Sequence, residues 1–310
     1  MSDCIYFDSG SNEEARRSSL YAGDIFVFSP RKSTLALCAF AKSMIEEAFA
    51  PLEPRMAQYS MPVEQYVAIA AALKPRFIHH PGALGLLHDV VEELGCDLAK
   101  TYIDVPRLRL VTHGGYLTSG VGYAHHPHRD TWYSAPMCQL NWWMPIYEFD
   151  ANSSMAFHPR FFDRHIKNGS RDFNYYVWNA EGRRNAARQI KSDERKQPRA
   201  EEHLDLQPQV SVVCPPGGIV LFSAAHLHST VPNTSGKTRY SLDFRTVNIE
   251  DVVGKRGAPN VDSEPQGTSL RDFVLGTDFT RMPEELVKPY DSDNLDSDVL
   301  VFQPSISEET

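Results

Sequence analysis

The apolar positions of the first hundred residues follow a helical period. Residues 33–49 contain good helix formers and an apolar stripe at Leu35, Leu37, Phe40, Met44 and Ala48. Residues 63–73 and 83–94 repeat this pattern, and we expect Pro75 to end the first of these two helices, because proline breaks a helix interior. The sequence therefore predicts a mostly helical N-terminal part over residues 1–100, after a short extended start.

From residue 107 the pattern changes to that of short strands bounded by Pro, Gly or Asn. These segments are 108–112, 137–147, 154–157, 210–214, 218–222 and 239–247. Many short strands with such boundaries are typical of a sandwich or a jelly roll. The predicted fold class is mainly β with flanking helices, with a double-stranded β-helix (jelly-roll, cupin-like) core over residues 101–250. We expect one catalytic domain that spans residues 1–310.

Two other segments stand apart from the predicted core. A charged insertion at residues 160–205 is rich in Arg and Lys, and we expect it to be helical. Charge runs are usually a solvated helix face, and the other interpretation is a lid over the site. The C-terminal extension, residues 251–310, is rich in Asp, Pro and Ser and is predicted to be partly irregular.

Composition excludes several classes of function. The net charge of −9 argues against a nucleic-acid partner, which usually needs a basic face. The longest apolar runs fall short of the roughly 20 residues of a membrane span. The first residues have neither the basic nor the apolar region of a signal peptide. Five cysteines, an odd number without C-x-x-C spacing, predict reduced thiols in a cytoplasmic protein.

The tripeptide His128-Arg129-Asp130 is the first candidate for chemistry. Side chains two apart on a strand point the same way, so this imidazole and this carboxylate could hold one metal ion. The pattern alone is weak, because the chain has twelve histidines and His203-Leu204-Asp205 repeats it. The second copy lies too close to His228 to leave room for the strands between them, so we expect it at the surface.

A third metal ligand is predicted at His228, after an apolar strand that ends near Phe222. His226 shares the expected strand face and could also be the ligand, but the spacing to Phe222 and Arg239 favours His228. Two histidines and one carboxylate on one face of an octahedron are the usual ligands of non-haem Fe(II) oxygenases. The three open positions can take a bidentate 2-oxo acid and O2.

Arg239 and Ser241 suggest which 2-oxo acid is used. A planar guanidinium can pair with the distal carboxylate of 2-oxoglutarate through two hydrogen bonds. Ser241 lies on the same strand face and could add a third. The predicted cofactors are Fe(II) at His128, Asp130 and His228, and 2-oxoglutarate as co-substrate.

The order H-x-D, a long gap and then H-S-T-V-P-N-T-S-x-x-x-R-x-S resembles the Fe(II)/2-oxoglutarate-dependent dioxygenase superfamily. Within it, the sequence is similar to the phytanoyl-CoA dioxygenase-like branch over residues 107–247. The positions that carry this likeness are Phe222, His228, Ser229, Asn233 and Arg239.

The resemblance implies an oxygenase that oxidises an unactivated C–H bond of a small metabolite and releases succinate and CO2. It implies hydroxylation, desaturation or cyclisation, with secondary-metabolite biosynthesis as one setting. Halogenating relatives have a small residue where this chain has Asp130, so the resemblance disfavours halogenation. Two alternatives remain: a cupin-like isomerase or oxidase that does not use 2-oxoglutarate, and a binding module that has lost activity.

Several further residues could contact the co-substrate or the substrate. Gln139 and Asn141 share one strand face and could touch 2-oxoglutarate, or could instead pair with the backbone. Arg109 and Arg245, like Arg107, could bind a substrate carboxylate, although pairing with a neighbour such as Asp243 is more common. Trp132 could form a wall of the site or belong to the aromatic core.

Overall fold

The computed structural model describes residues 4–122, 125–182, 186–190 and 192–291, which build two β-sheets and a layer of helices. The larger sheet has eight strands in the order β1-β2-β8-β5-β10-β3-β11, with β4 also paired to β10, and the smaller sheet has the order β7-β6-β9. The strands are β1 Ile5–Phe7, β2 Ile25–Phe28, β3 Thr101–Ile103, β4 Arg107–Val111, β5 Leu140–Pro145, β6 Met155–Phe157, β7 Val210–Ser211, β8 Ile219–Ser223, β9 His228–Thr230, β10 Arg239–Asn248 and β11 Val274–Leu275.

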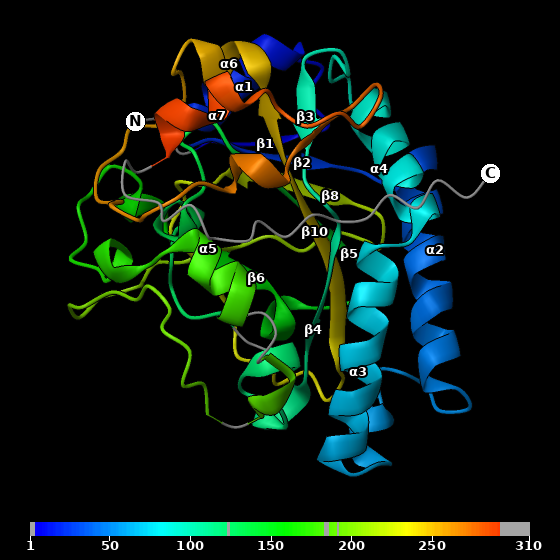
Figure 1. Cartoon of the computed structure of the whole chain (residues 1–310). Coiled ribbons are helices and arrows are strands. Elements are labelled where there is room, and N and C mark those ends of the chain that lie inside the picture. The colour runs from blue at the N-terminus through cyan, green and yellow to red at the C-terminus, as the bar shows by residue number, and fades with distance from the viewer. Residues whose placement is uncertain (1–3, 123–124, 183–185, 191, 292–310) are drawn as a thin grey trace.

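Three long helices cover one side of the larger sheet, while β6 and α5 lie on its other side (Figure 1). The three long helices are α2 Lys32–Phe49, α3 Val63–Ile78 and α4 Pro81–Glu93. The shorter helices are α1 Glu13–Tyr21, α5 Tyr175–Val177, α6 Ile249–Val253 and α7 Glu284–Val287. The predicted β-rich core with flanking helices is therefore confirmed. Among the residues described, no helix combines the length and the apolar character that crossing a membrane requires.

One predicted helix boundary is wrong. Pro75 does not end α3, which continues for three more residues to Ile78. The fully buried Phe77 lies in this last turn and packs in the main core. Burial of this large aromatic ring offsets the loss of one backbone hydrogen bond at the proline.

The strands β2 and β8 bury both of their faces. Phe26 and Leu221 point toward the helices and belong to the main core, whereas Val27 and Val220 point toward the smaller sheet. On that second side they pack with Phe157 of β6. This alternation is the period of two that a strand imposes, and it places apolar side chains between the two sheets at this end.

The central strand β10 shows a different alternation. Tyr240, Leu242 and Phe244 face the helices and are buried in the main core. The alternate positions on the other face are polar and are occupied by Arg239, Ser241, Asp243 and Arg245. The neighbouring strand β4 follows the same rule, with Leu108 and Leu110 in the main core and Arg107 and Arg109 on the other face. The space between the sheets therefore changes from apolar to polar at β10.

The charged insertion at residues 160–205 is not a long helix. Its described part contains short turns and the single helical turn α5, joined by irregular chain. No apolar stripe at helical spacing runs through it, and a helix without such a stripe gains little from packing.

The C-terminal extension has few regular elements up to residue 291 and is nevertheless packed. Leu270 and Phe273 are fully buried, and β11 pairs with β3. The prediction of an irregular tail also covered residues 292–310, which lie outside the described residues.

Candidate metal centre

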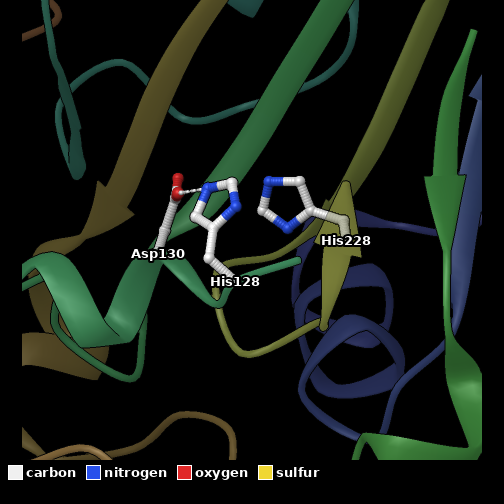
Figure 2. Close-up of side chains that lie close together, drawn as sticks. All are labelled: His128, Asp130 and His228. Carbon is white, nitrogen blue, oxygen red and sulfur yellow. Dashed lines mark ion pairs between the residues drawn. The ribbon is translucent and has the colours of Figure 1, made fainter. Parts of the chain in front are cut away.

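His128, Asp130 and His228 converge at one point, as Figure 2 shows. One ligand atom from each lies within 4.8 Å of the other two. Nε2 of His128 is 3.3 Å from Oδ1 of Asp130, close to the roughly 3 Å between neighbouring positions of an octahedron with bonds of about 2.1 Å. Two stretches a hundred residues apart thus supply a ligand set that fits a divalent metal ion.

Backbone pairing brings the two histidines together. His128 and His228 form an isolated antiparallel bridge, in which each backbone N–H donates to the other residue's carbonyl at 3.0 Å. Asp130 begins a short 3-10 turn, Asp130–Tyr133. The prediction that His128 and Asp130 share one strand face is therefore wrong for Asp130. The turn, rather than strand alternation, aims the carboxylate at the histidines.

Both imidazole rings are held in the same orientation. Nδ1 of His128 lies 2.8 Å from the carbonyl oxygen of His126, and Nδ1 of His228 lies 3.0 Å from the carbonyl oxygen of His226. A protonated Nδ1 donates to each carbonyl, which leaves the lone pair on Nε2. Such hydrogen bonds are the usual way in which proteins orient metal-binding histidines.

A line of amides holds the carboxylate. Asn141 Nδ2 donates to Asp130 Oδ2 at 3.0 Å, and Gln139 Nε2 donates to Asn141 Oδ1 at 2.9 Å. Ser269 Oγ donates to Gln139 Oε1 at 3.3 Å. Oδ1 of Asp130 remains directed at His128. Gln139 and Asn141 also line the cavity described below, so their predicted contact with the co-substrate stays a prediction.

Electrostatics favour the protonation states that a metal needs. Burial by itself would raise the pKa of Asp130, but the adjacent His128 side chain and the charge of Arg245 hold this pKa well below its usual range. Burial, with the neighbouring His128, lowers the pKa of His228 to about 4. At neutral pH the site therefore presents an anionic carboxylate and a neutral His228 imidazole, as metal ligands require.

The structure favours His228 over its rivals. His226 is fully buried, and its ring packs 4.8 Å from that of Phe162, outside the group of three ligands. His203 and Asp205 are exposed and, in the described part of the chain, do not belong to that group either.

A cavity of about 910 Å³ opens beside the three ligands, and Arg239 lines it. Nη1 of Arg239 donates to the carbonyl oxygen of Ser153 at 2.8 Å, and its guanidinium lies 5.5 Å from the ring centre of Trp143. Burial lowers the pKa of Arg239 to about 10. In the described part of the chain, Arg239 Nε and the fully buried Ser241 Oγ have no hydrogen-bond partner. Buried donors without partners are costly, so Arg239 fits an anion that is held in the cavity. Ser241 is not among the described residues that line the cavity, so its predicted hydrogen bond to the co-substrate stays a prediction.

The other predicted contacts have different outcomes. Arg109 lines the cavity but is paired with both carboxylate oxygens of Asp243. Arg245 lies 3.2 Å from Asp104 and 3.7 Å from Asp130, so it supports the metal ligand. Trp132 is a core residue: it is fully buried, donates to Asp262 at 2.8 Å, and is not among the described residues that line the cavity. The prediction that Trp132 contacts the substrate is therefore wrong.

Sequence reasoning missed several residues that support the site. Asp104 contacts both Arg107 and Arg245, and Asp262 accepts hydrogen bonds from Arg129 and Trp132. Lys74 of α3 also lines the cavity. No spacing rule links these positions to the ligands, because each reaches the site through tertiary packing alone.

Comparison with known proteins gives similar structures only. No family model matches the chain, and no curated protein sequence matches it significantly. The structure of EvdO2 from Micromonospora carbonacea var. aurantiaca with 2-oxoglutarate is 14% identical, with a TM-score of 0.44 over 77% of this chain and 92% of that one. The apo form of the non-haem monooxygenase ThoJ is 15% identical, with a TM-score of 0.39 over 82% of this chain and 80% of that one.

A third similar structure is the epimerase SnoN in complex with Fe3+, α-ketoglutarate and nogalamycin RO. It is 13% identical, with a TM-score of 0.38 over 83% of this chain and 98% of that one. These three are non-haem or 2-oxoglutarate-binding proteins, the kind that the sequence resembles. TM-scores below 0.5 at such identities do not establish a shared reaction, so the site itself has to carry the function.

Proposed function

We propose that this chain is an Fe(II)- and 2-oxoglutarate-dependent oxygenase that oxidises a C–H bond of a small molecule. The observation that carries the proposal is the pairing of two features in one cavity. One is the ligand set of His128, Asp130 and His228. The other is Arg239, a buried cation with an unmatched Nε.

Each feature has a separate role. His128, Asp130 and His228 would hold the metal, the ligand set that non-haem Fe(II) oxygenases use. Arg239 binds the distal carboxylate of 2-oxoglutarate through its free donor, and the Oγ of Ser241 adds a hydrogen bond. When bound, Fe(II) and 2-oxoglutarate supply the oxidant from O2 that attacks the substrate C–H bond, with release of succinate and CO2.

The surrounding chain secludes the site from water. In this proposal the two sheets are the two walls of a jelly-roll barrel, and the residues that would hold the metal lie on β9 and on the turn that starts at Asp130. Residues of the charged insertion line the same cavity, which favours its interpretation as a lid over its interpretation as a solvated surface. These residues are Phe173, Tyr175, Trp178, Asn179, Ala180, Ala186, Ala187, Arg195 and Gln197.

Anaerobic addition of Fe(II) and 2-oxoglutarate tests the proposal. We expect a visible charge-transfer band, because the 2-oxo acid then chelates a ferrous ion. His128→Ala should abolish the band. His203→Ala is the matched control, since it changes the exposed copy of the H-x-D pattern, and it should leave the band intact. Binding of the metal without any band would instead support the cupin-like alternative, and a band that persists in His128→Ala would contradict the assigned ligands.

A further inference from the structure

The cavity wall carries more positive than negative charge. Among its described lining residues the cations are Lys74, Arg107, Arg109, Arg195, Arg239 and Arg245, and the carboxylates are Asp130, Asp243 and Asp272. Asp104 and Asp193 contact these cations without lining the cavity. With these two included, the five arginines and the five carboxylates balance, and protonated Lys74 supplies the surplus positive charge. A divalent metal and the dianion 2-oxoglutarate would cancel each other and leave that surplus in place. The cavity therefore suits a ligand that brings one negative charge.

Arg107 of β4 is the cation best placed to bind that charge. Its side chain is only 10% exposed. Nη1 donates to Asp104, whereas Nη2 has no hydrogen-bond partner among the described residues. Burying a donor without a partner is costly, and more so for a charged group, so an acceptor is expected here. Arg107 lines the cavity, which is where that acceptor can enter.

The other arginines of the wall are already engaged. Arg109 pairs with both oxygens of Asp243, and Arg195 pairs with both oxygens of Asp193. Arg245 lies within 3.7 Å of three different carboxylates. Arg239 is assigned to 2-oxoglutarate. Apart from Arg239, Arg107 is the one arginine of the described cavity lining that combines deep burial with an unmatched donor.

We propose that the substrate is an organic acid with an apolar or aromatic body, and that Arg107 binds its carboxylate through Nη2. This inference rests on the proposed function and names the substrate class of that same site. Phe173, Tyr175 and Trp178 line the cavity with aromatic surface for the body of the molecule, and Lys74 adds a positive charge.

The same geometry separates the acid group from the carbon that reacts. Arg107 and Arg245 share Oδ2 of Asp104, and Arg245 in turn lies 3.7 Å from the metal ligand Asp130. The carboxylate subsite is therefore linked to the metal site through Asp104 and Arg245. Remote binding of this kind orients a substrate without occupying the open metal positions.

Matched pairs of ligands test the inference. The anaerobic holoenzyme, with Fe(II) and 2-oxoglutarate bound, is titrated calorimetrically with 3-phenylpropionate and indole-3-propionate, and then with the corresponding neutral amides. We expect at least one acid to bind about ten- to a hundredfold more tightly than its amide, the range for a charge-assisted hydrogen bond. If no acid binds better than its amide, the inference is overturned.

Variants test whether Arg107 is the charge that causes the preference for the acid over its amide. Arg107→Met should remove the preference for the acid while the charge-transfer band remains. Arg107→Lys retains a cation for Asp104 but lacks the second donor, and it should reduce the preference even if the methionine variant fails to fold. The control is Arg171→Met, an exposed arginine that is also paired with a carboxylate, Glu264, and it should bind as the wild type does. A preference that survives both changes at Arg107 refutes the assignment, whereas absence of the band in the wild type refutes the proposed function instead.

Discussion

The two faces of β10 differ in polarity, because its alternate residues are apolar on the side of the helices and polar on the side of the cavity. On the side of the helices, Tyr240, Leu242 and Phe244 are almost fully buried and belong to the main core. On the cavity side, Arg239 and Asp243 replace that apolar surface with charge. Apolar burial stabilises a fold, whereas burial of charges costs desolvation that pairing only partly offsets. The cavity face is therefore maintained at the expense of stability, as expected of a functional surface.

The largest expected effect is the loss of stability in Phe244→Ala, a substitution on the helix face of β10. Phe244 is 1% exposed and stacks on Trp142 with ring centres 5.4 Å apart. Truncation should lower the free energy of unfolding by about 3–5 kcal/mol, because a cavity replaces the ring. Urea denaturation measures the loss. Because Phe244 also lines the cavity, stability alone tests this face, and a destabilisation below about 1 kcal/mol would show that it is not the packed core.

Arg239→Met makes the converse change on the cavity face. The affinity for 2-oxoglutarate should fall by about a hundredfold, because a charge-assisted pair to its distal carboxylate is lost. Stability should stay level or rise, since the variant no longer buries a cation with an unmatched donor. Titration of the charge-transfer band and urea denaturation report the two effects separately.

Arg239→Lys is the matched control for that change, because it keeps the charge and loses the planar fork. Its affinity for 2-oxoglutarate should fall between those of the wild type and Arg239→Met. An Arg239→Met variant that is destabilised but binds 2-oxoglutarate normally would make Arg239 a structural residue.

The same two faces explain what could be predicted from the sequence. Alternation indicated β4, short apolar runs bounded by Pro, Gly or Asn indicated β5, β8 and β10, and spacing indicated His228 and Arg239. The four consecutive apolar residues of β2 were not predicted as a strand of the core, because a short apolar run by itself does not show which strands it pairs with. The insertion at 160–205 was expected to be helical because it is rich in helix-forming charged residues, yet without an apolar stripe it stays irregular.

Contacts that depend on side-chain placement were beyond sequence reasoning. The hydrogen bond from Asn141 to Asp130 requires the turn at Asp130 to lie next to β5. Arg107 and Arg245 can both contact Asp104 because β3 and β4 pair with β10. The sequence could place these residues on a common face, but it could not select their partners.

Asn141→Ala probes this supporting layer, with a smaller expected effect than Arg239→Met. Removing the donor to Oδ2 of Asp130 should weaken metal binding about tenfold, the lower end for partners of metal ligands. Competition with a chelator of known affinity measures the loss, and the exposed Asn152→Ala serves as control. An unchanged metal affinity would mean that Gln139 and Asn141 serve the co-substrate or the barrel end instead.

The smallest expected effect concerns Lys74, a cation that α3 brings to the cavity. Burial, with the nearby charge of Arg109, lowers the pKa of Lys74 from its ordinary value of 10.5 to about 7. Between these two values the unfolded chain binds more protons than the folded chain, so this group makes the free energy of unfolding rise with pH across that window. Lys74→Met lacks this contribution, and its stability advantage over the wild type should be greatest below pH 7 and shrink toward pH 10.5. Urea midpoints of both proteins at several pH values check this, and parallel pH profiles would show that Lys74 is well solvated and not part of the cost of the cavity face.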